Sequence, residues 1–240
     1  MTSRQPAPNP TVVHRAAFIV SIYCAAQLIA TDQQGKSNEP TDHMVPVDCH
    51  VEPAYMQLLA GRLFVSRADY ARVLVMPSTD EGEFSIAIYS RHDRGDETAL
   101  TCTRAEKNLW YSMFQAQQAN AHVPPVPVIR TDAAFPKSTA LAVSKAIEEM
   151  IVHSGPPNHS VEVLDGTNIT FSIERSGAKP LQALLAPYAH GMRSQSLHEL
   201  TKLLTDYCDA DPADRQNIAR QIEEQATKLL QAHKNSDKAR

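Results

Sequence analysis

The sequence has few glycines and lacks the short motifs that most often accompany catalysis or nucleotide binding. Only 8 of its 240 residues are glycine, which leaves little material for a phosphate-binding loop. It contains no G-x-S-x-G, no G-x-x-x-x-G-K-[ST], no G-x-G-x-x-G and no paired C-x-x-C. His198-Glu199 begins like a zinc-protease motif, but Lys202 occupies the position of the second histidine. The common enzyme classes are therefore disfavoured, although a dispersed catalytic site needs no contiguous motif.

The sequence also lacks a basic cluster. Its formal net charge is -4, its pI is about 6.2, and no run of lysine and arginine occurs. Nucleic-acid binding needs clustered positive charge to neutralise phosphates, so we expect no nucleic-acid partner. Hydrophobic residues at 42% and charged residues at 21% are typical of a globular protein in water. No motif points to a cofactor or a metal, and we expect neither.

Residues 16–30 carry no charge and are largely apolar. This stretch is shorter than the roughly 20 apolar residues of a membrane-spanning helix, but it suits a signal-peptide core. Cleavage after Ala26 would place Cys24 and Ala26 as the small pair before the cut, whereas cleavage after Ala30 places Leu28 there. We therefore predict that residues 1–30 are a signal peptide, that the protein is periplasmic or secreted, and that no stable membrane span remains after cleavage. The alternatives are an uncleaved anchor and a buried helix of a cytosolic protein.

The predicted export bears on the four cysteines, because it decides how many of them remain and whether they can form a disulfide. Signal cleavage would remove Cys24 and leave an odd number, which allows at most one disulfide within the chain. Cys49 lies in an irregular segment that could reach a strand, so we predict a Cys49–Cys102 disulfide. Cys208 continues the apolar stripe of a helix, and we expect it to be a small buried side chain.

Residues 31–52 are polar and contain Gly and Pro, as is typical of a linker or an irregular segment. Within them, His43, Asp48, Cys49 and His50 are residue types that can bind metals or form a nucleophilic site. Their spacing matches no tetrahedral zinc site, because a second pair is missing downstream. A thiol and an imidazole can also act as nucleophile and base, so Cys49 and His50 are weak candidates for the catalytic residues of a dispersed Cys/His/Asp site.

Residues 135–154 predict the amphipathic helix around which the rest of the fold is organised. Its apolar residues recur at three- and four-residue steps: Leu141, Val143, Ala146, Ile147, Met150 and Ile151. Ser138 or Thr139 could cap its start, yet neither is followed three residues later by Glu or Gln. Packing rather than capping should therefore stabilise this helix.

Short apolar segments around this helix predict strands, together with a helix at residues 53–63. Strands are expected at residues 70–76, 84–90, 98–105 and 109–114, with a helix over residues 105–116 as the competing interpretation of the last one. A short edge strand is expected at residues 128–131.

The chain after residue 155 predicts a hairpin and two helices. In the hairpin of residues 160–175, a three-residue loop ending in Gly166 pairs Val161 with Ile169 and keeps the apolar residues on one face. Ser196 begins a capping box, and Asp211 followed by Pro212 marks the start of the last helix.

These segments predict an α+β fold. An antiparallel sheet, consisting of a meander of about four strands plus a hairpin, is joined by a crossover helix, and a C-terminal helical pair packs on one face. Residues 53–235 should form a single domain, with a frayed tail at 236–240. The function that these observations favour is an exported non-catalytic protein that binds another protein, such as an inhibitor, immunity or envelope accessory factor. The alternatives are a hydrolase with a dispersed site and a cytosolic structural or interaction subunit.

Overall fold

The computed structural model describes residues 44–46, 53–64, 68–91, 97–155, 166–175, 177–185, 189 and 191–238. Its helices are α1 (Pro53–Leu63), α2 (Leu109–Gln118), α3 (Lys137–Val152), α4 (Met192–Asp209) and α5 (Arg215–Lys238). Its strands are β1 (Val45–Pro46), β2 (Ala71–Met76), β3 (Phe84–Arg91), β4 (Glu97–Ala105), β5 (Val128–Ala134), β6 (Asn168–Ile173) and β7 (Leu181–Leu185).

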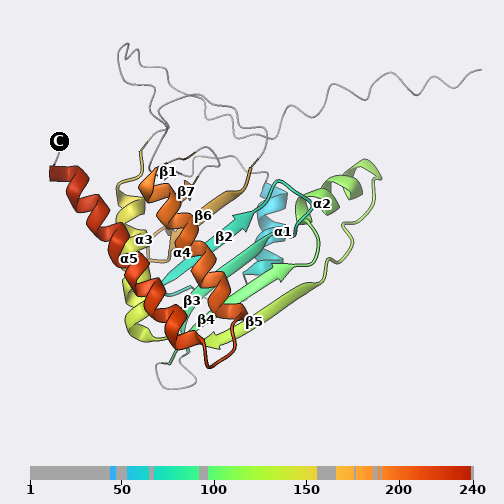
Figure 1. Cartoon of the computed structure of the whole chain (residues 1–240). Helices are drawn as coiled ribbons and strands as arrows, with labels where there is room; N and C mark the ends of the chain where they lie inside the picture. The colour runs from blue at the N-terminus through green and yellow to red at the C-terminus, as the bar shows by residue number, and fades with distance from the viewer. Residues whose placement is uncertain are drawn as a thin grey trace, which may run out of the picture.

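The strands form one antiparallel sheet in the order β1-β7-β6-β2-β3-β4-β5 (Figure 1). β2, β3 and β4 make the meander, and β5 extends it after the chain has passed through α2. β6 and β7 join on the other side of β2, after α3. The predicted α+β class with a single antiparallel sheet is confirmed.

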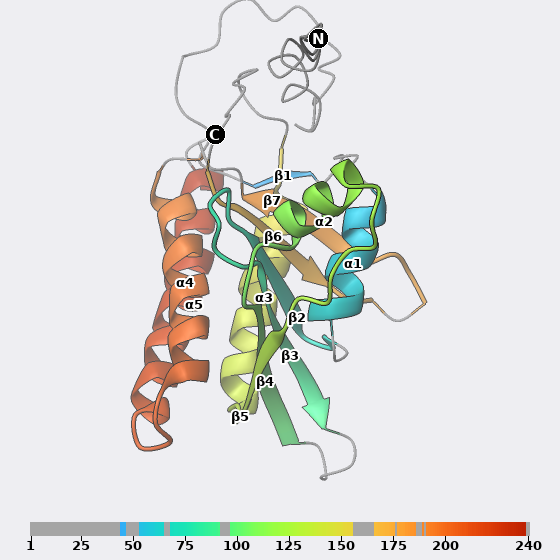
Figure 2. The ribbon, with the colours of Figure 1, turned by 90° about the vertical axis from the view of Figure 1, so that its right-hand side faces the viewer.

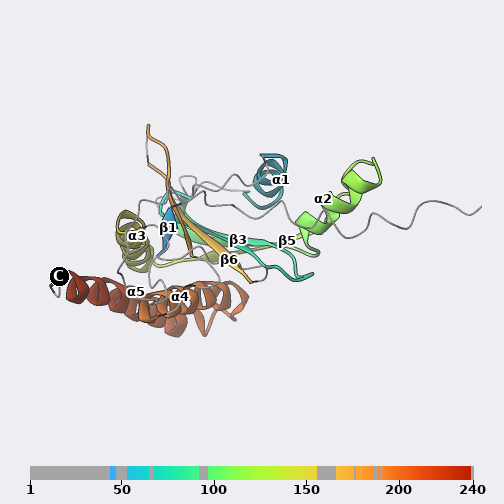
Figure 3. The ribbon, with the colours of Figure 1, turned by 90° about the horizontal axis from the view of Figure 1, so that it is seen from above.

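Helices cover both faces of the sheet. α3, α4 and α5 pack against one face, here called the α4/α5 face, and α1 and α2 pack against part of the opposite α1/α2 face (Figures 2 and 3). The alternation along β4 shows the division, because Leu100 and Cys102 lie in the α4/α5 core whereas Ala105 lies in the α1/α2 core. The predicted packing of the C-terminal helical pair on one face is confirmed.

α3 occupies the predicted place and buries most of the predicted stripe. Ile147 has no exposed surface, whereas Leu141 is 53% exposed, so assigning Leu141 to the stripe is wrong. Pro136 precedes the helix, and no side chain caps its first turn. The Ser138 and Thr139 hydroxyls instead donate to Glu223 Oε1 of α5 at 2.8 and 2.7 Å. These bonds tie the start of α3 to the C-terminal helix.

The predicted strand at residues 109–114 is wrong, and the competing helix is the one that forms. Asn108 stands before α2, and its side chain accepts a hydrogen bond from the Tyr111 N–H at 3.0 Å. The carboxylate of Glu83, which is remote in sequence, accepts hydrogen bonds from two further N–H groups of this first turn, those of Leu109 and Trp110. The fourth strand of the extended meander is therefore β5.

The predicted hairpin at residues 160–175 is also wrong in its pairing. Ile169 of β6 pairs with Val75 of β2 on one edge and with Leu185 of β7 on the other, so neither edge is left for Val161. Residues 156–165 lie outside the described part of the chain. Gly166 does have a positive φ of 139°, and the hairpin that joins the sheet is β6–β7.

Both C-terminal helices begin at residues other than the predicted ones. α4 starts at Met192, and the Gly191 carbonyl accepts the first helical hydrogen bond from Gln195 N–H at 3.0 Å, so Ser196 is not its N-cap. α5 starts at Arg215 after a turn, and the Asp214 carbonyl accepts from Ile218 N–H at 3.2 Å. The Asp211 carbonyl accepts from Asp214 N–H at 2.9 Å, so residues 211–214 form a turn before α5. Among the described residues, no helix combines the length and apolar character that crossing a membrane requires.

Candidate functional site

The candidate catalytic residues Cys49 and His50 lie outside the described residues, so both remain predictions, as does the Cys49–Cys102 disulfide. Cys102 is buried on β4, and its described neighbour is the buried Cys208 of α4. The hydrogen bond between the two thiols lowers the pKa of Cys102 and, with burial, raises that of Cys208. The burial predicted for Cys208 is confirmed. The Asp209 carboxylate lies near both thiols, and it forms an ion pair with Arg104 at 3.4 Å.

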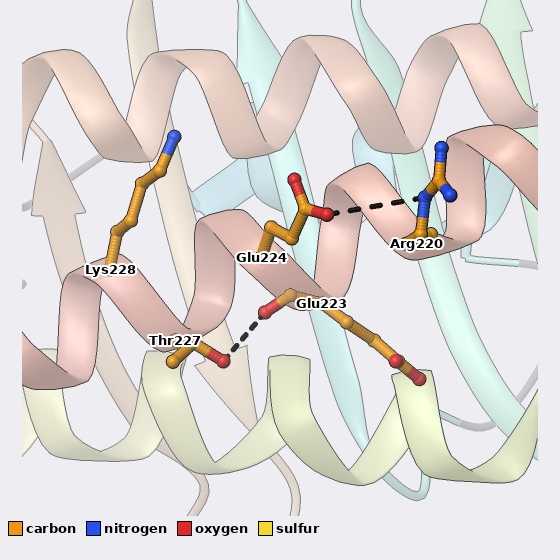
Figure 4. A pocket seen from close by; sticks show the side chains of 5 residues that line it. All are labelled: Arg220, Glu223, Glu224, Thr227 and Lys228. Atoms are coloured by element: carbon orange, nitrogen blue, oxygen red, sulfur yellow. Dashed lines mark hydrogen bonds and ion pairs between the residues drawn. The ribbon is translucent and has the colours of Figure 1, made fainter.

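No metal centre is formed by the part of the chain that the structure describes, where no three His, Cys, Asp or Glu side chains gather. The hollow shown in Figure 4 has a volume of about 510 Å³ and lies along α5. It is lined by Arg220, Glu223, Glu224, Thr227 and Lys228.

Four of the five residues around this hollow form hydrogen bonds or ion pairs within α5 or with α3. Arg220 and Glu224 form an ion pair at 4.0 Å, and Thr227 donates to the Glu223 carbonyl at 2.8 Å (Figure 4). The Glu223 carboxylate accepts from α3. All five lining residues come from one helix, so no groups converge from different elements as they do in a small-molecule site.

Glu83 is a buried carboxylate that accepts three hydrogen bonds. It has no exposed surface. Its Oε1 accepts from the Tyr55 hydroxyl at 2.6 Å and from Trp110 N–H at 3.1 Å, and its Oε2 accepts from Leu109 N–H at 2.6 Å. Burial, together with the neighbouring carboxylate, raises the pKa of Tyr55 well above its ordinary value. Because these donors belong to α1 and α2, Glu83 joins both helices to the start of β3 and is closed to a substrate.

β5 has a different character, because its outer edge is open among the described residues. Phe135 N–H, just beyond β5, donates to Thr98 O at 2.8 Å across the ladder to β4. In an antiparallel pair, successive residues point their N–H and C=O groups alternately toward and away from the neighbouring strand. The backbone groups of Val128, Arg130 and Asp132 therefore point outward. No described strand pairs with them, as the position of β5 at the end of the strand order shows (Figure 1).

One outward group of this edge is already occupied. The carbonyl of Ala134 accepts a hydrogen bond from the Tyr207 hydroxyl of α4 at 2.6 Å. Tyr207 also packs edge-on against Phe135, with 4.9 Å between the ring centroids. α4 therefore holds the end of β5, and the outward groups of Arg130 and Asp132 keep their capacity for a further strand.

The side chains of β5 combine exposed apolar groups with an ion pair. Val128 is 38% and Ile129 57% exposed. Two contacts of 3.0 Å join the Arg130 guanidinium to the Asp132 carboxylate, and the Thr101 hydroxyl also donates to Asp132. Burial raises the pKa of Asp132, but the hydrogen bonds from Thr101 and Arg130 outweigh burial and bring the pKa below its usual value. The edge thus presents fixed charges of both signs and open backbone groups.

The sequence predicted an edge strand at residues 128–131 but gave no indication of its outward groups. Those depend on the register with β4, which is a tertiary property. The fold and this edge define an α+β protein with an antiparallel sheet that is open along β5 in its described part. No protein-family model, curated protein sequence or solved structure matches the chain.

Proposed function

We propose that this protein is exported, has no catalytic role, and acts by binding another protein that adds an extended segment to the outer edge of β5. The observation that carries the proposal is the row of outward N–H and C=O groups at Arg130 and Asp132, beside the exposed side chain of Ile129. An open strand edge is a template for pairing with another chain, and many binding modules use it in this way.

The partner in this mode is recognised by two kinds of contact. Main-chain hydrogen bonds supply affinity, and the side chains of alternate residues supply selectivity. Here the Arg130–Asp132 pair lies on the α1/α2 face, and Ile129 lies on the α4/α5 face, opposite Arg104 in the register. The fitting partner segment is extended, carries charges of both signs on one face and offers a small or apolar residue to Ile129.

Replacing Arg130 with proline should weaken binding, because proline removes the outward N–H without removing a hydrogen bond to β4. The matched variant Arg130→Ala loses the same side chain but keeps the N–H. A photo-crosslinking amino acid at position 128, introduced in the producing cells, should give one discrete product. We expect the yield to fall by about tenfold more in Arg130→Pro than in Arg130→Ala, which corresponds to the loss of one hydrogen bond and an orphaned partner group.

The control for this experiment places the same crosslinker at Lys202, whose side chain is 72% exposed on α4. Equal products from positions 128 and 202, or equal yields from the proline and alanine variants, would contradict binding at the β5 edge. Thermal unfolding of the two variants verifies that both remain folded.

Export has its own test, which is independent of the edge. The charge-free residues 16–30 support a cleaved signal peptide. After expression in a secreting host, intact-mass measurement should find a mature chain that begins near Gln27 or Thr31. A full-length product in the soluble fraction would contradict export and leave the binding proposal standing.

A further inference from the structure

We infer that the segment added to β5 is the β5 strand of a second copy of this chain, paired antiparallel about Thr131. This inference rests on the proposed function, because it uses the same open edge and names the partner. A two-fold axis through Thr131 places Arg130 opposite Asp132 of the other copy. It also places Ile129 opposite Ala133, and Val128 opposite Ala134. A contact of this kind is self-complementary and closes after two chains.

The backbone fits this register. Arg130 and Asp132 both point their N–H and C=O groups outward, as the ladder to β4 requires. Opposite each other across the axis, they can exchange two N–H···O=C bonds, and symmetry repeats this exchange on the other side of Thr131. If the register moved by one residue, a residue whose N–H and C=O point outward would lie opposite one whose groups point toward its own β4. These hydrogen bonds would then be lost. The permitted registers are therefore those that pair outward residues with one another.

Charge separates the permitted registers. An axis through residue 130 would place Arg130 opposite Arg130 of the other copy, and an axis through residue 132 would place Asp132 opposite Asp132. Like charges directly opposite each other destabilise a sheet, whereas opposite charges stabilise it. With the axis at Thr131, each Arg130 keeps the ion pair with its own Asp132 along the strand, at 3.0 Å. It also lies directly opposite Asp132 of the other copy. This axis alternates the four charges along one face.

The apolar side chains agree with the same register. The larger and exposed side chains, Ile129 and Val128, lie opposite Ala133 and Ala134. A large residue opposite a small one can cover it without a clash, so Ile129, which is 57% exposed, is buried on association. An axis at residue 129 would instead place Asp132 opposite Val126, which lies outside β5. Fewer residues of the two strands would then pair.

The size of the contact predicts a weak dimer. β5 has 7 residues, and a pair of such strands buries less surface than the roughly 1,600 Å² of a standard stable interface. We therefore expect association that depends on concentration rather than a permanent dimer.

Charge reversal tests the inference in sedimentation experiments on the mature chain at concentrations up to about 1 mM, a range that covers weak association. Wild type should dimerise. Arg130→Asp and Asp132→Arg should each be monomeric, because each variant brings like charges opposite each other across the axis. An equimolar mixture of the two variants should dimerise, and so should the double variant Arg130→Asp/Asp132→Arg. Recovery in the mixture also verifies that both single variants are folded.

Each failure has its own meaning. A wild-type chain that stays monomeric throughout this range overturns the second copy as partner, and a dimer that survives both single reversals overturns the register. The crosslinker at position 128 separates these failures from that of the proposed function. A product with twice the mass of the chain supports both proposals. A product with another mass, whose yield falls about tenfold more in Arg130→Pro than in Arg130→Ala, supports the edge and overturns the second copy. The absence of any product overturns both.

Discussion

Replacing Glu83 with alanine should lower the free energy of unfolding by roughly 3–5 kcal/mol, the range for breaking a buried charged network. The substitution removes the acceptor of three hydrogen bonds, which come from the Tyr55 hydroxyl and from the N–H groups of Leu109 and Trp110. The first two of these residues are buried, so their donors would lose a partner without gaining water. Urea denaturation followed by circular dichroism measures the loss.

Two matched variants show whether the loss arises from this network. Tyr55→Phe removes one of the three donors and should cost about 1–2 kcal/mol, near the value of one hydrogen bond to a charged group. Glu81→Ala changes an exposed acid two residues away and should stay within about 0.5 kcal/mol. A loss below about 1 kcal/mol in Glu83→Ala, the range of surface substitutions, would mean that Glu83 does not hold α1 and α2 on the sheet.

Replacing Ile147 with alanine should cost roughly 2–5 kcal/mol, as is typical when a large buried side chain is truncated and leaves a cavity. Ile147 has no exposed surface and belongs to the core that α3 shares with the sheet, α4 and α5. α3 has no side-chain cap at its start, so its position depends on this packing. The free energy of unfolding from urea denaturation again gives the measurement.

Leu141→Ala is the matched control on the same helix. Leu141 is 53% exposed, so the same kind of truncation removes little buried surface and should cost at most about 0.5 kcal/mol. Similar losses for the two variants would contradict the position of the core. A loss in Ile147→Ala below about 1 kcal/mol, the range of surface substitutions, would contradict it on its own.

Both predictions concern the scaffold that presents β5. Glu83 fixes the start of α2, the element before β5 in the chain, and Glu106 N–H donates to Pro127 O at 3.0 Å just before β5 begins. On the other face, Tyr207 of α4 holds the carbonyl of Ala134 at the end of β5. The open edge is therefore anchored at both ends, which limits the conformational entropy that a pairing strand would have to offset.

The elements that local patterns describe could be predicted from the sequence. The helix at residues 53–63 agrees with α1, because Pro53 suits a first turn and Tyr55, Leu59 and Leu63 recur at helical spacing. The body of α3 and the strands β2, β3 and β4 also follow from periodicity. The α+β class with its antiparallel sheet follows from their order along the chain.

The candidate site could be predicted only in part. An edge strand near residue 128 was expected, but not its extension to Ala134 or the outward direction of its backbone groups. The residues that the sequence singled out, Cys49 and His50, lie outside the described residues. The ion pair of Arg130 and Asp132 could not be predicted from the sequence, because opposite charges two residues apart are common in loops and strands alike.

The apolar periodicities of the sequence were enough to predict the fold class and the position of most elements. Elements whose conformation or pairing depends on groups remote in sequence became clear only in the folded chain. Residues 109–114 form a helix because Glu83 supplies acceptors to its first turn, and β6 pairs with β2 and β7 rather than with residues near Val161. The physical reason is the same in both cases. Hydrogen-bonding partners far apart along the chain meet only after folding, and no local pattern contains them.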